Sequence, residues 1–215
     1  MGTVGSDPSR SVAPESAEIA DAVRDICDRD GHCRLQDGTE VRLRPIEPTD
    51  ARLCNAMLEA CSRKSLYLRY ERIISEPLDE LSKRLCSPDS DAELTVVAET
   101  QIDGSSALIG VAQLLADPAH RAAEYALLVA DPWQSKGLGS ALTDCCLRLA
   151  TIWGVARVVA EFLPENMRII RILENREFDM TCDMQEHVVS GQKEISPRDV
   201  NDPPDAALLR DEVGC

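Results

Sequence analysis

The stretch VADPWQSKGLGS, at positions 129–140, holds the residues of this chain that are best suited to bind an anion. It has the pattern V-x4-Q-x2-G-x-G, with an apolar run before it and an amphipathic helical pattern after it. Glycines at 137 and 139 let backbone N–H groups approach an anion without an intervening side chain, and the N-terminal end of the following helix adds positive charge. The stretch therefore predicts a pyrophosphate cradle at a strand-to-helix junction.

The spacing of the glycines separates this loop from commoner nucleotide-binding loops. The chain has no G-x4-G-K-[ST], which argues against a P-loop, and no G-x-G-x2-G, which argues against a dinucleotide-binding fold. What remains resembles the acyl-CoA loop of the GNAT superfamily of N-acyltransferases. That resemblance implies acetyl-CoA as the co-substrate and requires no metal.

The resemblance also implies where the coenzyme binds. Backbone groups at the end of the strand would contact the pantetheine, and the loop would contact the pyrophosphate, with Lys136 adding a charge near the phosphates. Asn166 is either the N-cap of a later helix or a hydrogen-bonding partner of the pantetheine arm, and the two roles are compatible. The predicted coenzyme-binding residues are Leu127, Leu128, Val129, Gln134, Ser135, Lys136, Gly137, Leu138, Gly139, Ser140 and Asn166.

Glu124 is the candidate general base for transfer of an acyl group to an amine. A lysine amine has a pKa near 10.4 in water, so a base must remove a proton before the nitrogen attacks. Glu124 is the only acid in an otherwise apolar strand, and apolar surroundings would raise the pKa of its carboxyl into the useful range. The alternative is a surface glutamate that faces out of the sheet and pairs with Arg121.

Two stretches resemble bacterial protein-lysine acetyltransferases of the Pat type. SLYLRY at 65–70 is similar to that family's S-L-Y-x-R-[FY], and AEYALLV at 123–129 is similar to A-E-[FY]-A-[VL]-x-V. The second likeness implies that Glu124 is the general base, often acting through water. The first implies that Tyr67, Arg69 and Tyr70 border the acceptor entrance and contact the substrate; the alternative is that they are ordinary packing and surface residues of a helix.

Two positions depart from the wider superfamily. Many small-molecule GNAT enzymes have N-x6-Y in the last helix, whose tyrosine protonates the thiolate, whereas Leu173 stands seven residues after Asn166 here. Pat-type enzymes commonly lack that tyrosine, so its absence supports this branch and leaves the acid unassigned. Glu177 stands where a glycine usually ends that helix, and because a left-handed residue costs Glu about 1 kcal/mol more than Gly, we expect another turn geometry there.

The elements that must position these residues follow from hydrophobic periodicity and turn residues. Their predicted order is β-α-α-β-β-β-α-β-α-β, an α/β arrangement with a mixed, mostly antiparallel sheet and helices on both faces. This is the GNAT order, and the resemblance covers roughly residues 41–180. The predicted strands are 39–44, 94–99, 107–115, 122–129, 155–163 and a final strand or pair from Phe178; the predicted helices follow an N-cap at 49–50 and cover 78–85, 138–152 and 166–176.

One domain with two appendages is expected. Residues 1–38 are predicted to form an N-terminal arm with a short helix that docks on the main body, and residues 39–190 to form the acetyltransferase domain. Residues 191–215 contain three prolines and few large apolar side chains, which is typical of a flexible tail.

Composition restricts the partners and the compartment. A formal charge of −15 argues against nucleic acid and anionic membranes as partners and favours a cationic acceptor. No apolar run approaches the roughly 20 residues that cross a bilayer, and no signal peptide is evident. The nine cysteines are an odd number, so we expect them to be reduced and the protein to be cytoplasmic. Cys27, His32 and Cys33 lack the C-x2-C pair of a zinc site, so no metal is expected.

Three functions remain open from the sequence. The first is acetyl-CoA-dependent acetylation of a protein lysine by direct transfer, with an acyl-CoA synthetase as a possible target implied by the Pat resemblance. The second is acetylation of a small amine such as a polyamine, an amino acid or an aminoglycoside, since these cations also suit an acidic protein. The third is a non-catalytic acyl-CoA-binding protein that keeps the fold. The acyl chain preference, the regulation and the oligomeric state are not predicted.

Overall fold

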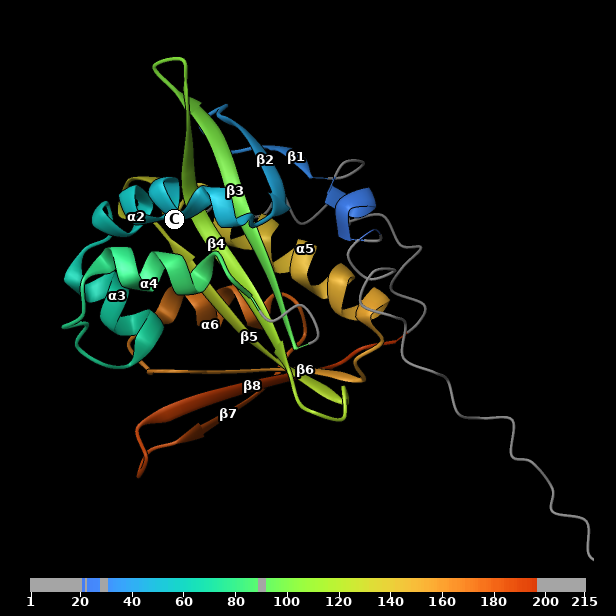
Figure 1. The fold of residues 1–215 in the computed structure, drawn as a ribbon. Helices are drawn as coiled ribbons and strands as arrows, with labels where there is room; N and C mark the ends of the chain where they lie inside the picture. Colours follow the sequence, from blue (N-terminus) through green and yellow to red (C-terminus); the bar gives the residue numbers. More distant parts are fainter. Residues whose placement is uncertain (1–20, 22, 28–30, 89–91, 197–215) are drawn as a thin grey trace, which may run out of the picture.

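A computed structural model describes residues 21, 23–27, 31–88 and 92–196 of the chain (Figure 1). An eight-stranded sheet runs through them in the order β1-β2-β3-β4-β5-β6-β8-β7, and every neighbouring pair is antiparallel except β5 and β6. The strands are β1 (His32–Arg34), β2 (Glu40–Pro45), β3 (Glu93–Ile102), β4 (Ser105–Ala116), β5 (Ala122–Val129), β6 (Arg157–Phe162), β7 (Asp179–Asp183) and β8 (Val188–Glu194).

Helices cover both faces of the sheet (Figure 1), so the predicted fold class is confirmed. On one face lie α2, α3 and α4, and on the other lie α5 and α6. Short 3-10 turns precede α2 and α5. The helices and 3-10 turns are η1 (Pro48–Asp50), α2 (Ala51–Glu59), α3 (Arg63–Tyr70), α4 (Leu78–Leu85), η2 (Asp131–Trp133), α5 (Leu138–Trp153) and α6 (Met167–Glu174).

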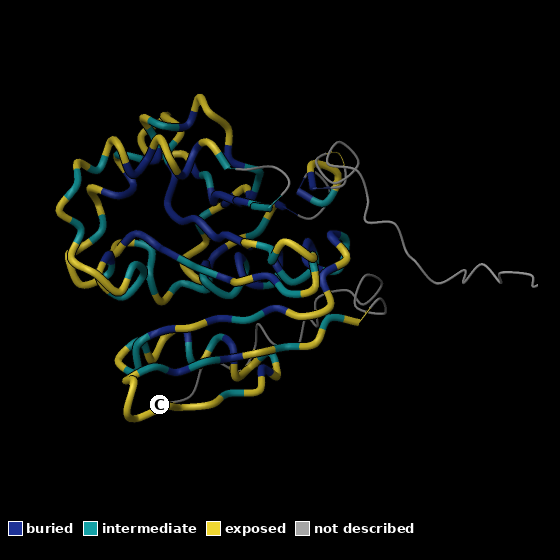
Figure 2. Tube along the Cα trace, turned by 60° about the horizontal axis from the view of Figure 1, so that its bottom comes forward, coloured by how far each residue is buried: buried dark blue, intermediate teal, exposed yellow. Residues whose placement is uncertain are grey.

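Side chains that alternate along the central strands feed two hydrophobic clusters. In β4, Val111 points into the cluster under α2–α4 and Ala112 into the cluster under α5 and α6. Trp153 of α5 is 1 % exposed, and Met57 of α2 is 2 % exposed. Figure 2 shows the buried stretches running along the central strands, while β7 is mostly exposed. The centre of the sheet is therefore buried on both faces, whereas its edge at β8 and β7 is more exposed.

The long helix behind the anion loop is α5, and its apolar positions follow the predicted face. Leu142 and Leu149 are at most 1 % exposed. The helix ends at Gly154, whose φ of 78° is the left-handed cap that glycine adopts without strain. The N-terminal end of α5, at Leu138, follows β5 after the short turn η2.

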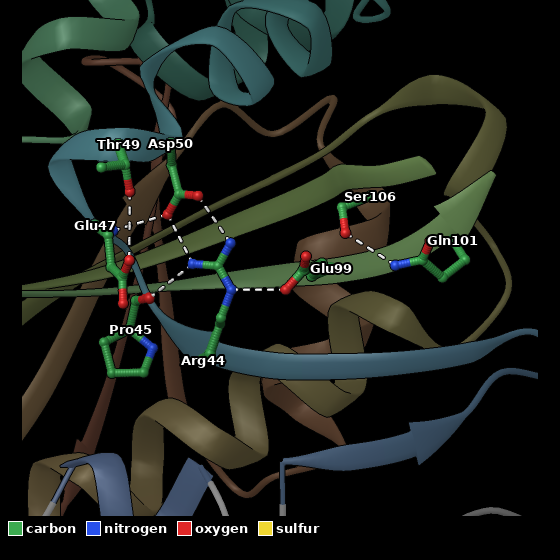
Figure 3. A network of polar contacts seen from close by, with 8 residues as sticks. All are labelled: Arg44, Pro45, Glu47, Thr49, Asp50, Glu99, Gln101 and Ser106. Carbon is green, nitrogen blue, oxygen red and sulfur yellow. Dashed lines mark hydrogen bonds and ion pairs between the residues drawn. The ribbon is translucent and has the colours of Figure 1, made fainter. Parts of the chain in front are cut away.

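Arg44 of β2 anchors α2 to the sheet (Figure 3). Its guanidinium donates to both carboxylate oxygens of Asp50 at 2.7 and 2.8 Å and to Glu99 of β3 at 2.7 Å. Burial alone would raise the pKa of Asp50, but the hydrogen bonds from Arg44 and from the Glu47 N–H lower it below its ordinary value. Asp50 is the N-cap residue of α2, within the predicted pair, but its carboxylate makes no capping hydrogen bond in α2 and binds Arg44 instead.

Three features differ from the sequence-based prediction. The chain forms three helices rather than two between β2 and β3, because 63–70 is the separate helix α3. Strand β1 lies inside the predicted arm and pairs with β2, and β8 extends to Glu194, inside the predicted tail. The sheet therefore extends beyond the predicted domain at both ends. Glu177 adopts a φ of 57°, so the expectation of another turn geometry is wrong, and the turn keeps its left-handed residue.

The helical segment before β1 packs on the main body. Val23 is 5 % and Cys27 is 1 % exposed, and both belong to the cluster under α5. The rest of the predicted arm before position 21, and the predicted tail from 197 onward, lie outside the described residues.

Three properties of the described residues concern membrane spans, disulfides and metal ligands. No helix there is long and apolar enough to cross a membrane. The eight cysteines in the described part of the chain are free. In the same part, no group of three or more His, Cys, Asp or Glu side chains is arranged to hold a metal ion.

Candidate active site

The site is organised by the place where β5 and β6 part. These parallel strands pair only at Ala122, Ala123 and Glu124, opposite 157–159. Beyond Glu124, β5 continues to Val129 paired with β4, and no described strand pairs with its other edge. Backbone N–H and C=O groups along that edge are therefore available to a ligand.

The first cleft, of about 510 Å³, opens along this unpaired edge. Its walls come from α3, the end of β5, the loop before α5, and α6. Nine of the eleven predicted coenzyme-binding residues line it: Leu127, Leu128, Val129, Gln134, Ser135, Gly137, Gly139, Ser140 and Asn166.

The loop between β5 and α5 has the backbone geometry of an anion cradle. Ser135 and Gly137 both have positive φ, 58° and 90°, and the 90° angle at 137 is one that glycine adopts readily. A Cβ on Gly139 would lie 2.9 Å from Cδ1 of Ile172 on α6. The absence of a side chain at Gly139 therefore leaves room for Ile172 as well as for an anion.

These features fit the long, phosphorylated coenzyme that the sequence predicts. The unpaired edge of β5 offers peptide groups to an amide-containing arm, while the cradle and the first turn of α5 offer N–H groups to a pyrophosphate. Asn166 is the N-cap residue of α6, but its side chain makes no capping hydrogen bond, and it lines the cleft. Asn166 therefore occupies the N-cap position while its side chain stays available to a ligand in the cleft.

Two predicted coenzyme residues lie elsewhere. Lys136 is absent from the cleft lining; its Nζ lies 2.9 Å from the Asp37 carboxylate and 4.7 Å from the centre of the Trp133 ring. The hydrogen bond from Lys136 is the largest cause that lowers the pKa of Asp37 to about 2. Leu138 is 1 % exposed and packs in the core under α5.

A second cleft, of about 230 Å³, meets the first where β5 and β6 part. It contains Glu124, Tyr70 and Arg69, together with residues of β6. The two clefts share residues from α3, β5 and α6, so together they form one passage. The shared residues are Leu68, Arg69, Leu127, Asn166 and Ile169.

Glu124 is exposed, so the apolar surroundings expected from the sequence are wrong. It lies on the α3 side of the sheet, opposite Leu115 of β4 and Val159 of β6. It makes no hydrogen bond or ion pair with Arg121 in the described structure, so the alternative pairing is not found either. The carboxylate instead faces the second cleft, where it can accept a proton from a bound molecule.

The three predicted substrate residues have different surroundings. Arg69 lines both clefts and donates a hydrogen bond to the side chain of Gln113, which is 6 % exposed. The Tyr70 hydroxyl is buried and has no hydrogen-bond partner among the described residues, and burial raises its pKa. Tyr67 is 44 % exposed and lines neither cleft.

The position at which many small-molecule GNAT enzymes have a tyrosine acid is buried in this structure. Leu173 is fully buried in the core beneath α6. The hydroxyl of Tyr125 on β5 is hydrogen-bonded to Thr143 Oγ1 of α5 at 2.8 Å, and burial raises its pKa well above the ordinary value. Neither residue is suited to protonate a thiolate in the passage.

Four charged cleft residues were not predicted from the sequence, and one of them, Glu71 after α3, lines the second cleft. Glu161 of β6 lines the second cleft, and Arg168 and Arg171 of α6 line the first. The two arginines stand three residues apart in MRIIRILE, which places them on one helix face. This spacing of two arginines in an acidic chain could have been recognised in the sequence. The place of Glu161 in the cleft could not, because it depends on where β6 separates from β5.

Comparisons with known proteins agree with this geometry. The GNAT domain of PAT from S. lividans is 26 % identical, with a TM-score of 0.67, over 76 % of this chain and 95 % of that chain. A spermidine N-acetyltransferase from Vibrio cholerae, solved with CoA and spermine, is 22 % identical, with a TM-score of 0.59, over 73 % of this chain and 96 % of that chain.

A third solved structure has the same fold in a longer protein. It is a cAMP-binding acyltransferase from Mycobacterium smegmatis, 19 % identical, with a TM-score of 0.55, matched over 90 % of this chain and 56 % of that chain. The family model described as Acetyltransferase (GNAT) family matches residues 58–178, which are more than half of the sequence and include every residue that lines the two clefts. The chain therefore belongs to the GNAT family and is an N-acetyltransferase.

Proposed function

We propose that this enzyme acetylates a lysine side chain of a protein, with acetyl-CoA in the first cleft and the lysine entering through the second. The observation that carries this proposal is that the two clefts share five lining residues and that Glu124 lines the second of them. A coenzyme and an acceptor that enter from opposite ends meet beside that carboxylate. Such an arrangement supports direct transfer, because no enzyme nucleophile need carry the acetyl group.

The charge of the second cleft supports a cationic acceptor. Glu71 at the end of α3, Glu124 on β5 and Glu161 on β6 contribute carboxylates from three elements. Arg69 is the cation in its lining, and Arg69 is hydrogen-bonded to Gln113. An alkylammonium group entering this cleft would be attracted by the nearby carboxylates before it loses its proton.

The residues then act in a defined order. Acetyl-CoA supplies an acetyl group activated as a thioester. Glu124 removes a proton from the lysine ammonium, directly or through water, and holds that proton while the neutral nitrogen bonds to the acetyl carbon. The C–N bond forms as the C–S bond breaks, and the nitrogen loses a second proton as the leaving thiolate takes one up. The β5 edge and the cradle orient the coenzyme throughout.

The support for a protein lysine over a small amine comes from the relatives rather than from the clefts. The 26 % identity to the PAT domain and the two Pat-like stretches support a protein substrate, possibly an acyl-CoA synthetase. The spermidine N-acetyltransferase at 22 % identity shares the fold, and a polyamine would also suit three carboxylates. A small polycation is therefore the second candidate.

Mass spectrometry of an acetyl-CoA synthetase from the same organism tests the proposal. We expect a gain of one acetyl group on its catalytic lysine with the wild-type enzyme and no gain with Glu124→Gln. The matched control is Glu80→Gln, an exposed position on α4 outside both clefts, which should keep full activity. Full activity of Glu124→Gln would refute the base assignment.

A panel of polyamines, amino acids and aminoglycosides completes the experiment. Acetylation of a polyamine but of no protein would replace the first candidate by the second. Binding of acetyl-CoA without turnover of any acceptor would support the non-catalytic alternative.

A further inference from the structure

Two arginines on α6 face the first cleft and are exposed. Arg168 and Arg171 lie three residues apart, in the first and second turns of the helix, and both line the cleft. They stand across from the cradle formed by the loop before α5. The cleft therefore has backbone N–H groups on one wall and guanidinium groups on the other.

The other cations near this cleft are already engaged, including Arg69, which lines it and donates to Gln113. Lys136 is paired with Asp37 at 2.9 Å. Arg176 holds both carboxylate oxygens of Asp144 at 2.6 and 2.8 Å and donates to the Ser140 carbonyl at 3.1 Å. Lys136 and Arg176 are committed to holding the loop and the two helices together.

The α6 arginines have no such acidic partner among the described residues. Arg168 donates to the Gln134 Oε1 atom at 2.6 Å, which is a neutral acceptor. Gln134 is fixed by its own hydrogen bonds to the Val129 carbonyl at 2.9 Å and to Ser65 at 3.1 Å. Arg171 makes no side-chain hydrogen bond or ion pair in the described part of the chain. In a protein with 38 acids and 23 bases, two arginines that face a cleft without a carboxylate are available to an anion.

We infer that Arg168 and Arg171 bind the phosphates of the coenzyme and supply the positive charge that the sequence assigned to Lys136. A guanidinium group presents two parallel N–H donors to a phosphate, so these residues would add directed hydrogen bonds as well as charge. They would also offset the repulsion between a strongly acidic protein and a polyanionic coenzyme. The inference rests on the proposed use of acetyl-CoA.

Calorimetric titration with CoA tests the inference by affinity rather than by turnover. We expect Arg168→Gln and Arg171→Gln each to weaken CoA binding about tenfold, as loss of a charge-assisted hydrogen bond implies. Raising the salt concentration should weaken binding to the wild type more than binding to the double variant, because salt screens the two arginine charges that the double variant lacks. Arg168→Lys should lie between wild type and Arg168→Gln, since it keeps the charge and loses the fork.

Arg52→Gln is the matched control, because Arg52 is exposed on α2 and lines neither cleft. Arg52→Gln removes one positive charge, as each of the two single variants does, and should leave the CoA affinity unchanged. Retention of wild-type affinity by the double variant would overturn the inference, and so would an equal loss in Arg52→Gln. A wild-type protein that binds no CoA would refute the proposed function itself.

Discussion

Removal of the Tyr70 hydroxyl should stabilise the free enzyme. The oxygen is buried and has no hydrogen-bond partner among the described residues, and Tyr70 lines the second cleft. A buried polar group without a partner costs about 1–3 kcal/mol. Tyr70→Phe removes that group and keeps the ring, so we expect the free energy of unfolding to rise by about 1 kcal/mol.

Thermal unfolding measures this effect, and Tyr125→Phe provides a control of opposite sign. For a chain of this size, 1 kcal/mol corresponds to a shift in Tm of about 2–4 °C. The Tyr125 hydroxyl is equally buried, but it is hydrogen-bonded to Thr143 at 2.8 Å. Tyr125→Phe should therefore lower Tm by about the same amount.

The same substitution tests the role of Tyr70 toward the acceptor. If the acceptor supplies the missing partner, Tyr70→Phe lowers kcat/KM for the acceptor about tenfold and leaves the affinity for CoA unchanged. A Tyr70→Phe enzyme that is destabilised as much as Tyr125→Phe would show that the hydroxyl has a partner in the free enzyme, and the reasoning would be refuted.

Three further predictions concern the fold and the acceptor. Glu177→Gly should raise the unfolding free energy by about 1 kcal/mol in denaturant titrations, because Glu177 has a φ of 57°; an unchanged midpoint would contradict this. Arg44→Met should lower it by about 3–5 kcal/mol, since Asp50 and Glu99 lose their partner. Both carboxyls have folded-state pKa values lowered from 3.8 and 4.5, so their stabilisation is present above pH 4.5 and is lost as acid protonates them; a wild-type stability independent of pH below 4.5 would exclude it. Glu161→Gln should raise KM for a cationic acceptor about threefold with kcat unchanged, and an unchanged KM in steady-state kinetics would remove Glu161 from the acceptor cleft.

Local signals predicted most of the fold. Strand β5 and helix α4 have the bounds that alternation and helical spacing predict, and Gly154 ends α5 as expected. Helix α3 was not placed in the predicted order because its apolar pattern is weak, with Leu66 as its buried residue. Its position depends on tertiary contacts such as the hydrogen bond from Arg69 to Gln113 of β4, which no local pattern reveals.

The candidate site divides in the same way. Glycine spacing was enough to predict the cradle, because backbone conformation is a local property. The partner of Lys136 could not be predicted, since Asp37 stands 99 positions earlier in the chain. The exposure of Glu124 also could not be predicted, because it depends on where β6 turns away from β5.

The short pairing of β5 with β6 has a mechanical consequence. It is the seam between two parts of the sheet, one with the five strands β1 to β5 and one with the three strands β6, β8 and β7. Helix α5 contacts strands on both sides of the seam, and the core on that face is continuous from Ala123 to Phe162. The passage lies beside this seam, between α3 on the opposite face and the first turns of α6. A rotation of the two parts about α5 would widen the passage and leave the other strand pairings intact, and we expect product release to depend on such a rotation.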